Sequence, residues 1–560
     1  MLELRAPVIT LYLTGRVPAV ESRQGQGTPL LAGAPVRSPA IADRVTARPG
    51  VWATLAVAAV TLAGAALRVA VAHQSLFADE LSTYWIVSTR GLRGVLSTVH
   101  SNAEITPPLS FVLGWLATRI DLTPEMLRLP SLVAGIATIP ILYRLGVRTV
   151  GRAAGAVGAS LTALAPFMIY YSAEARGYAL VMAFVALATL TMLIAVDSGH
   201  ARWWVAYAAS SGAAIYTHYT CVFVLGVGLL WLLWAHPEAR RPALLANLAV
   251  LVAYIPWFSG FRNDLNSPTT DILSALQPFD ALHVRLSIEH WSVGYPYSSI
   301  APLRDLPGRP ALVLLGLALA VAVGGLVVRW QRDRWSRRAL RDRRLLLIVA
   351  LALATPVGEA LFSAFGSTTL FSTRNLASSW PAFALSLATL LVSAGPRLGL
   401  VVVSLAIASS AIGALKMLEG RFQRPDYAAA GAYIDRSAAA GDAVIDESGV
   451  LSPGPLTHLD PVLHRPLPVF RANAPQEHEH PFTVFDPVVS PAAASRRAVT
   501  AGGRHVFLVS DVAGARALGR LPGYRAVATR TYPGVLRVVV RTYTRGSSRP
   551  TPERRAPGTG

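Results

Sequence analysis

Two adjacent carboxylates, Asp79 and Glu80, follow the first long apolar run of the sequence after a few residues. A carboxylate at a membrane edge can act as a general base toward a hydroxyl nucleophile. The alternative is structural, because acidic residues also favour the first turn of a helix, and spacing alone favours it. His100 and Glu104 follow in the same segment. Together these groups could bind a divalent cation, or act as a base and its positioner.

A second group of polar residues lies in YYSAEARGYAL (170–180), which contains Glu174, Arg176 and Tyr178. An arginine in this place can bind a phosphate through its planar fork, and we predict that Arg176 does so. The alternative is an interfacial pair between Arg176 and a carboxylate such as Glu174, anchored by the aromatic rings around it.

Two more candidates stand in IYTHYT (215–220), which contains His218, and in FSTRNLASSWP (371–381), which contains Arg374. A single histidine at a membrane edge is more often a structural hydrogen-bonding group than a ligand. Arg374 interrupts the usual distribution of positive charge in a membrane protein. It therefore suits an anionic lipid headgroup.

The composition indicates that membrane helices must position these residues. Of 560 residues, 53% are hydrophobic and 15% charged, and the mean hydropathy is +0.44. Soluble proteins carry about 25% charged residues, so the composition argues against a cytosolic enzyme and against a disordered chain. The single cysteine excludes an intramolecular disulfide and a Cys-rich metal site. The net charge of +20 comes almost wholly from arginines placed between apolar runs, which indicates lipid and not nucleic acid as the partner.

Runs of about 20 apolar residues can cross a bilayer as helices. We predict eleven such spans, at 51–72, 129–148, 153–171, 176–196, 203–218, 220–235, 242–260, 309–329, 345–363, 376–394 and 397–416. The segment 329–344 carries eight arginines and should be cytoplasmic. The same assignment places the N-terminus and every other arginine-bearing short loop inside, with 1–50 as a disordered cytoplasmic tail.

The opposite, outer face then receives the first loop (73–128), a loop at 261–308 and the chain after 416. Every candidate residue falls on this face, although the topology was assigned without them. The apolar stretch 107–118 is too short to span, and we predict a helix at the membrane interface there. The fold class is therefore an all-α polytopic membrane domain over 51–420.

From residue 421 the composition becomes that of a soluble domain. A helix should begin after Asp426 and run to about Arg436. Strands are predicted at 442–446, 504–510, 524–532 and 535–543. We predict a small extracytoplasmic α/β domain over 421–545 that assists acceptor recognition and not chemistry, followed by a disordered tail at 546–560.

Four motifs together resemble a known family. They are Leu-Arg-x6-Ser-Leu-Phe-x-Asp-Glu (67–80, with six residues between Arg68 and Ser75), Glu-x2-Pro-Pro-Leu (104–109), Tyr-Ser-x-Glu-Ala-Arg-x-Tyr-Ala-Leu (171–180) and Tyr-Thr-His-Tyr (216–219). This set resembles the GT-C membrane glycosyltransferases, and within them the bacterial glycosyltransferase family 39, aminoarabinose-transferase-like and protein O-mannosyltransferase group. The resemblance extends over about 60–420. This chain differs in having Phe77 where Trp is common, and in lacking a basic residue beside Glu104.

The resemblance implies transfer of a sugar, mannose-like or arabinose-like, from a polyprenyl-phosphate donor to a cell-envelope glycan, lipid or protein at the bacterial plasma membrane. It implies Asp79 as catalytic base with Glu80 beside it, Glu104 shaping the site, and Arg176 and Arg374 facing the donor phosphate. No cofactor is firmly implied beyond a divalent cation that Asp79, Glu104 and His218 could share. Attack by the activated hydroxyl would invert the anomeric carbon, and positive charge would stabilise the departing phosphate. The alternatives are a transporter or flippase of a lipid-linked substrate, and a non-catalytic protein that displays the tail domain.

Overall fold

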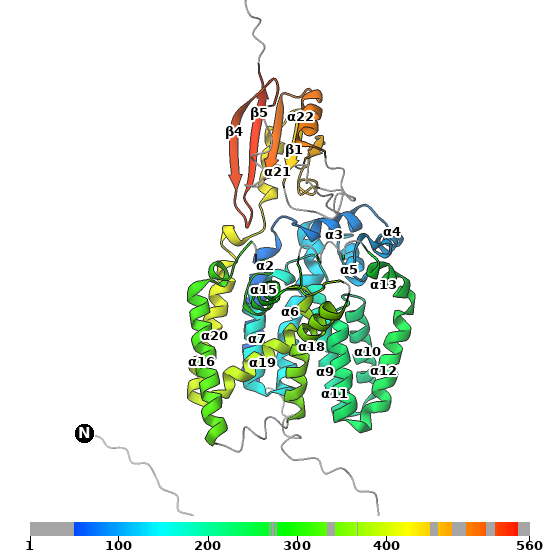
Figure 1. Cartoon of the computed structure of the whole chain (residues 1–560), viewed down its shortest axis with the longest axis vertical. Helices are drawn as coiled ribbons and strands as arrows, with labels where there is room; N and C mark the ends of the chain where they lie inside the picture. The colour runs from blue at the N-terminus through cyan, green and yellow to red at the C-terminus, as the bar shows by residue number, and fades with distance from the viewer. Residues whose placement is uncertain are drawn as a thin grey trace, which may run out of the picture. The chain divides into compact units, whose positions relative to one another are not determined.

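The computed structural model describes residues 50–267, 270, 274, 277–298, 300–332, 342–366, 368–448, 457–472, 489–510 and 521–546, all of which lie in one compact unit (Figure 1). The predicted disordered tails at 1–50 and 546–560 fall outside these residues, apart from one residue of each. The central part of the arginine-rich segment, 333–341, also falls outside them.

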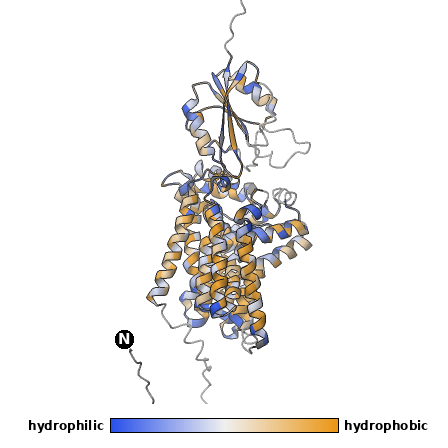
Figure 2. Cartoon of the chain, turned by 90° about the vertical axis from the view of Figure 1, so that its left-hand side faces the viewer, coloured by the Kyte–Doolittle hydropathy of each residue, from blue (hydrophilic) through white to orange (hydrophobic). Residues whose placement is uncertain are grey.

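Apolar helices form the body of the protein, and in Figure 2 most of their length is coloured as hydrophobic. In chain order they are α2 (Val51–Ala72), α6 (Pro124–Thr149), α7 (Arg152–Leu164), α8 (Pro166–Ser172), α9 (Tyr178–Ser198), α10 (Ala201–Ile215), α11 (Cys221–Ala235), α12 (Arg240–Tyr254), α13 (Phe258–Leu265), α16 (Arg309–Arg332), α18 (Arg343–Phe365), α19 (Trp380–Ser393) and α20 (Pro396–Lys416). Among the described residues, eight helical segments are long and apolar enough to span, or nine if the bent pair α7–α8 counts as one. All eleven predicted spans are helical, but α10 and α11 have only 15 residues each. The span count therefore stays a prediction.

The bend of 60° between α7 and α8 positions the segment that carries Glu174. Pro166 begins α8 and has no N–H to donate to the carbonyl four residues earlier. Arg68, fully buried in α2, fills that place: its Nη2 donates to Thr162 O at 2.8 Å and its Nη1 to Ala163 O at 3.0 Å. The buried arginine thus stabilises the broken helix by satisfying its free carbonyls.

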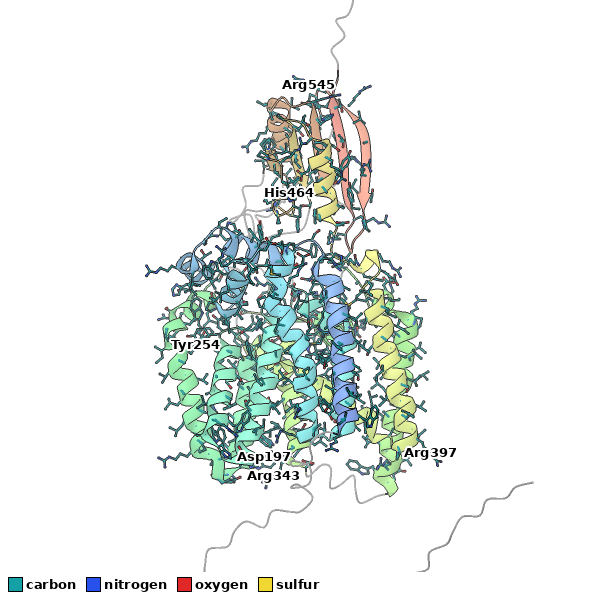
Figure 3. All side chains as sticks on the ribbon, turned by 180° about the vertical axis from the view of Figure 1, so that it is seen from behind. Asp197, Tyr254, Arg343, Arg397, His464 and Arg545 are labelled. Atoms are coloured by element: carbon teal, nitrogen blue, oxygen red, sulfur yellow. The ribbon has the colours of Figure 1, made fainter. Side chains whose placement is uncertain are left out.

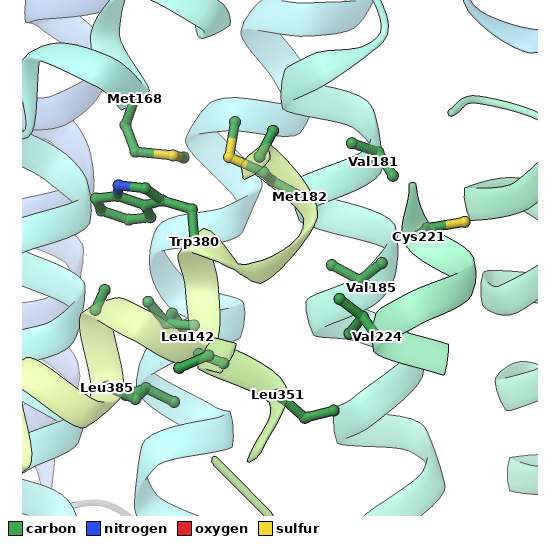
Figure 4. Packing of buried hydrophobic residues seen from close by; sticks show 14 of the residues in the cluster. Leu142, Met168, Val181, Met182, Val185, Cys221, Val224, Leu351, Trp380 and Leu385 are labelled. Atoms are coloured by element: carbon green, nitrogen blue, oxygen red, sulfur yellow. The ribbon is translucent and has the colours of Figure 1, made fainter. Parts of the chain in front are cut away.

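The core is packed around α9, whose side chains are hydrophobic on all sides. Figure 4 shows Trp380 of α19 beside Met168 of α8 and Met182 of α9. The ring of Trp380 also stacks on Phe167, with centroids 6.3 Å apart and planes within 12°. This packing holds the ends of α8, α9 and α19 together, where Glu174, Tyr178 and Arg374 emerge.

The predicted common side of the arginine-bearing loops agrees with how the helix ends are grouped. Figure 3 shows Asp197, Arg343 and Arg397 at the same end of the helical body. Asp197 forms ion pairs with Arg148 and with Arg344, so three separate loops meet there. Which side of the membrane this end faces stays a prediction.

The first loop forms short helices: α3 (Asp79–Ser88), α4 (Leu92–Thr98), the π-helix η1 (Val99–Ala103) and α5 (Leu109–Ala117). At nine residues, α5 is too short to cross a bilayer, as predicted for 107–118. Helix α15 (Ala281–Val293) lies in the second predicted outer loop.

The C-terminal domain contains one sheet of order β2-β1-β3-β5-β4. The strands are β1 (Ala443–Glu447), β2 (Val469–Arg471), β3 (His505–Ser510), β4 (Tyr524–Tyr532) and β5 (Val538–Arg545). β2, β1 and β3 are parallel, and β3, β5 and β4 antiparallel. Helices α21 (Tyr427–Ser437) and α22 (Pro491–Thr500) pack with different sets of sheet residues. The Asp426 side chain caps α21 as predicted, accepting from Ala429 N at 2.9 Å, whereas β2 and α22 had no clear sequence signal.

Candidate active site

Asp79 is the first residue of α3, and its side chain leaves the helix end instead of capping it. The capping position belongs to Ala78, whose φ of 52° lies in the left-handed region that non-glycine residues rarely adopt. Strained backbone of this kind is found preferentially at functional sites. Asp79 and Glu80 do stand in the first turn of α3, as the structural alternative predicts, but no side chain caps the helix.

Asp79 and Arg374 form an ion pair that remains accessible. Arg374 Nη1 donates to Asp79 Oδ2 at 2.6 Å. The side chain of Arg374 is 22% exposed and that of Asp79 is 26% exposed. Burial acts to raise the pKa of Asp79, but Arg374 and Arg176 outweigh it, so the pKa is lowered. Among the described residues, the other two nitrogens of Arg374 make no hydrogen bond, so the guanidinium can still bind an anion.

Glu80 lies in a fully buried network next to the accessible pair. Arg128 Nε donates to Glu80 Oε1 at 2.7 Å and Nη2 to Oε2 at 2.6 Å. Ala175 N also donates to Oε1, at 2.9 Å. Burial opposes ionisation, yet Arg128 and Arg424 hold the pKa of Glu80 below its usual value. Because both oxygens are occupied, Glu80 suits the positioning of α3 against α6 and the 173–177 segment, and not proton transfer.

Glu104 and Arg176 form a second buried pair, with exposures of 6% and 7%. Arg176 Nη1 and Nη2 donate to the two carboxylate oxygens at 3.0 Å and 2.9 Å. Ser82 Oγ is bonded to the same carboxylate. The guanidinium of Arg176, which was predicted to contact the donor phosphate, is thus bound by Glu104. The carboxylate that pairs with Arg176 is Glu104 and not Glu174.

Glu174 is buried without a partner for one of its oxygens. Its side chain is 2% exposed, and Oε2 makes no hydrogen bond among the described residues. Burial is the main cause that raises the pKa of Glu174 to about 8, and Glu80 adds to it. Tyrosine rings lie around it, with successive ring contacts joining Tyr178, Tyr171, Tyr170, Tyr295 and Tyr297. A neutral carboxylic acid among phenol rings is a hydrogen-bond donor at neutral pH.

The two histidines have different surroundings. The ring of His218 lies 5.3 Å from that of Tyr178, and burial together with Arg374 and Arg176 lowers the pKa of His218 to about 3. His218 is therefore a neutral member of the site. His100 instead ties the first loop to α13: its Nε2 is 2.9 Å from Ser259 Oγ, and Asn263 donates to its backbone oxygen at 2.9 Å.

The predicted cation site was tested against this arrangement. Within the described part of the chain, no three His, Cys, Asp or Glu side chains are grouped so as to hold a metal ion. Asp79 is paired with Arg374 and Glu104 with Arg176, and the His218 ring lies beside both arginines. As they are paired here, these residues do not fit a divalent cation.

An apolar cavity of about 770 Å³ lies beside the first loop at His100. Its walls come from α10–α13, and they include Val222, Leu251, Ile255 and Phe258, with Arg262 as their charged residue. Ser259 and Asn263, which hold His100, also line it. The cavity therefore runs from the lipid-facing helices to the first loop that carries the candidate residues.

Sequence reasoning missed four residues of this group: Arg128, Arg424, Tyr295 and Tyr297. Arg128 lies near the start of α6, at the end predicted to be outer, so it breaks the positive-inside distribution as Arg374 does. That signal could have identified it. The tyrosines stand in an aromatic-rich loop, GYPYSS (294–299). Arg424 has no comparable signal.

Comparisons with known proteins agree with this architecture. Residues 106–259 match the family described as dolichyl-phosphate-mannose-protein mannosyltransferase. ArnT from Cupriavidus metallidurans, in a crystal structure bound to undecaprenyl phosphate, superimposes with a TM-score of 0.52 at 16% identity, covering 88% of this chain and 98% of that one. The chain has the GT-C fold. The apo state of the same protein gives a TM-score of 0.51 at 16% identity, covering 88% and 97%. A comparison with curated protein sequences gives no match.

The predicted resemblance to the GT-C membrane glycosyltransferases is thus confirmed, by sequence over 106–259 and by fold over most of the chain. It is a multi-pass membrane protein with a small C-terminal sheet domain.

Proposed function

We propose that the protein transfers a sugar from a polyprenyl-phosphate donor to a hydroxyl acceptor, with Asp79 as the base. One observation carries the proposal: of the four carboxyl side chains in the group, Asp79 alone has substantial exposure, at 26%. Glu80, Glu104 and Glu174 are 0%, 6% and 2% exposed. A base must reach the proton that it accepts, to roughly 2.6–3.2 Å, and only Asp79 is placed to meet a substrate.

In the proposed step, the acceptor oxygen forms a bond to the anomeric carbon while its proton passes to Asp79. The bond between the anomeric carbon and the phosphate oxygen breaks on the opposite face, and its electron pair leaves with the lipid phosphate. No general acid is needed, because a phosphate is already a good leaving group. The configuration of the sugar is inverted.

Arg374 links donor binding to the basicity of Asp79. In the structure it holds Asp79 ionised through one nitrogen. A donor phosphate would compete for the same guanidinium, since arginine binds phosphate through paired, charge-assisted bonds. Drawing Arg374 toward the phosphate would weaken its bond to Asp79. The pKa of Asp79 would then rise, making it a better base when the donor is present.

The apolar cavity between α10–α11 and α12–α13 suits the isoprenoid chain of the donor. Its volume of about 770 Å³ holds several isoprene units. ArnT, which has the same fold, has a crystal structure bound to undecaprenyl phosphate, and this supports the same lipid class here. The family match favours a mannose-like sugar, and an arabinose-like sugar is the alternative.

We further propose that the acceptor is a component of a bacterial cell envelope, met on the outer face of the plasma membrane, with the N-terminus inside and the C-terminal domain outside. The domain contacts the active loop directly: the His458 ring lies 5.8 Å from that of Phe77, two residues before Asp79. An acceptor held by this domain would be presented next to the base.

Mass spectrometry of envelope glycans and glycoproteins from cells with and without the gene tests this function. Loss of one glycosyl substituent, restored by the wild-type gene, is the expected result. Unchanged glycans, together with an accumulated or mislocalised lipid-linked sugar, would indicate a transporter instead. A reporter active only outside the cytoplasm, fused after residue 420, tests the orientation.

A further inference from the structure

The linker between the membrane helices and the C-terminal sheet places Arg424 inside the candidate site. Arg424 is 3% exposed. Its backbone N donates to Gln74 Oε1 at 3.0 Å, and Ala428 N donates to Ser75 Oγ at 2.9 Å. Both acceptors belong to the segment that leads into Asp79. The position of Arg424 is therefore fixed by the active loop itself.

The guanidinium of Arg424 shares a carboxylate with Arg128 and is short of hydrogen-bond acceptors among the described residues. Its Nε and Nη2 are buried and make no hydrogen bond among the described residues. Nε lies 3.2 Å from Glu80 Oε2, but without hydrogen-bond geometry, and that carboxylate is already held by Arg128. The guanidinium carbon lies 4.4 Å from the centre of the Tyr170 ring. A buried donor without a hydrogen bond lowers the stability of the folded protein, so an acceptor bound at this guanidinium would be stabilised.

Two more unfilled polar atoms belong to residues that act electrostatically on Arg424. They are Glu174 Oε2 and the Tyr170 hydroxyl, both buried. The other three arginines of the site are each paired with a carboxylate, as described above. With Glu174 protonated, the four arginines of the group face three carboxylates, and Arg128 and Arg424 share one of them, Glu80. Among the described residues of the group, one positive charge is therefore in excess.

We propose that Arg424 is a further ligand of the donor's phosphodiester, together with the Tyr170 hydroxyl and the carboxylic acid of Glu174. This inference rests on the proposed function. A phosphodiester carries one negative charge on two free oxygens, and these two oxygens together can accept hydrogen bonds from all three donors. The planar fork of arginine matches such oxygens in a way that a lysine cannot. The C-terminal part of the chain would then contribute to chemistry, and not only to acceptor recognition as the sequence predicts.

The protonation of Glu174 gives a second readout. At neutral pH the Glu174 carboxyl is mostly protonated, and above its pKa of about 8 it becomes a negative charge that repels phosphate. Donor affinity should therefore fall as pH rises from 7 to 9, and Glu174→Gln should abolish that fall. The groups that face Glu174 are Asp79, Glu80, Arg176 and Arg424, with Tyr170, Tyr171, Tyr178, Tyr295 and Tyr297.

Binding of the methyl ester of undecaprenyl phosphate to the purified full-length protein tests the proposal. This probe is a phosphodiester without a sugar, and it does not titrate between pH 6 and 9. Arg424→Gln should weaken binding by about 10-fold to 100-fold, as expected for charge-assisted hydrogen bonds. Arg421→Gln is the matched control, because Arg421 lies in the same linker with its side chain 66% exposed. Its affinity should equal that of the wild type.

The outcomes separate this inference from the proposed function. Wild-type affinity in a folded Arg424→Gln variant would overturn the inference and leave the function standing. Absence of binding by the wild type would overturn both. If Arg424→Gln does not fold, Arg424→Lys keeps the charge near Glu80. Weakened binding by the Lys variant supports the paired contact, and unchanged binding refutes it.

Discussion

The pair between Glu104 and Arg176 predicts a large, coupled loss of stability. Each side chain is about 93% buried, and two hydrogen bonds of 3.0 Å and 2.9 Å join them. Removing one partner of such a pair leaves an uncompensated buried charge, which costs about 3–5 kcal/mol. Glu104→Gln and Arg176→Gln should each lower the free energy of unfolding by about that amount. The double variant should lose much less than the sum, because it leaves no buried charge behind.

Reversible unfolding in mixed micelles, followed for the wild type, both single variants and the double variant, measures this coupling. Arg93→Gln is a suitable control, since Arg93 lies in the same first loop with an exposed side chain. Additive losses would refute the assignment of the pair. If Arg176→Gln is as stable as the wild type but binds the lipid phosphate more weakly, Arg176 is a phosphate ligand and not a structural partner of Glu104.

Two further predictions concern packing and the apolar cavity. A Cβ at Gly146 would lie 2.4 Å from Gly155 Cα, so Gly146→Ala should lower the free energy of unfolding by about 1–3 kcal/mol. Gly226→Ala, in open space, is expected to cause no loss in the same micelle assay. Leu251→Trp should weaken binding of undecaprenyl phosphate more than that of a two-isoprene phosphate, because Leu251 lines the cavity. Leu230 lies outside the cavity lining and is 67% exposed, so the Leu230→Trp variant should bind both lipids normally. Equal effects of the two substitutions would contradict the proposed role of the cavity.

The sequence predicts what depends on local hydropathy. Apolar runs identify the helices, because each must satisfy its backbone internally and bury or immerse its side chains. Asp79 and Arg374 were found because both are charged residues at helix ends on one predicted face. Their direct contact requires only that the two helix ends lie close together, and in the structure Arg374 Nη1 lies 2.6 Å from Asp79 Oδ2.

Pairing between distant residues was less accessible. Arg176 could face a phosphate or any of several carboxylates, and the choice of Glu104 depends on how the first loop folds over α9. Glu80 was expected to assist Asp79 in catalysis. In the structure both of its carboxylate oxygens accept hydrogen bonds from Arg128 of α6. Arg424 is more than 340 residues from Glu80 in sequence, and its place depends on the linker's bonds to Gln74 and Ser75. Such contacts follow from tertiary packing and not from any local pattern.

The role of Asp79 as the base is tested most directly by restoring the gene-deletion strain with Asp79→Asn and measuring the transferred sugar by mass spectrometry. Asn keeps the shape of the side chain but cannot accept the proton, so the transfer rate should fall by about 10²–10⁴. Asp121→Asn is the matched control, because Asp121 is an exposed residue of the same loop, and it should restore the wild-type level. The account predicts loss of the sugar with Asp79→Asn at normal protein levels in the membrane. Near-wild-type transfer by that variant would contradict it.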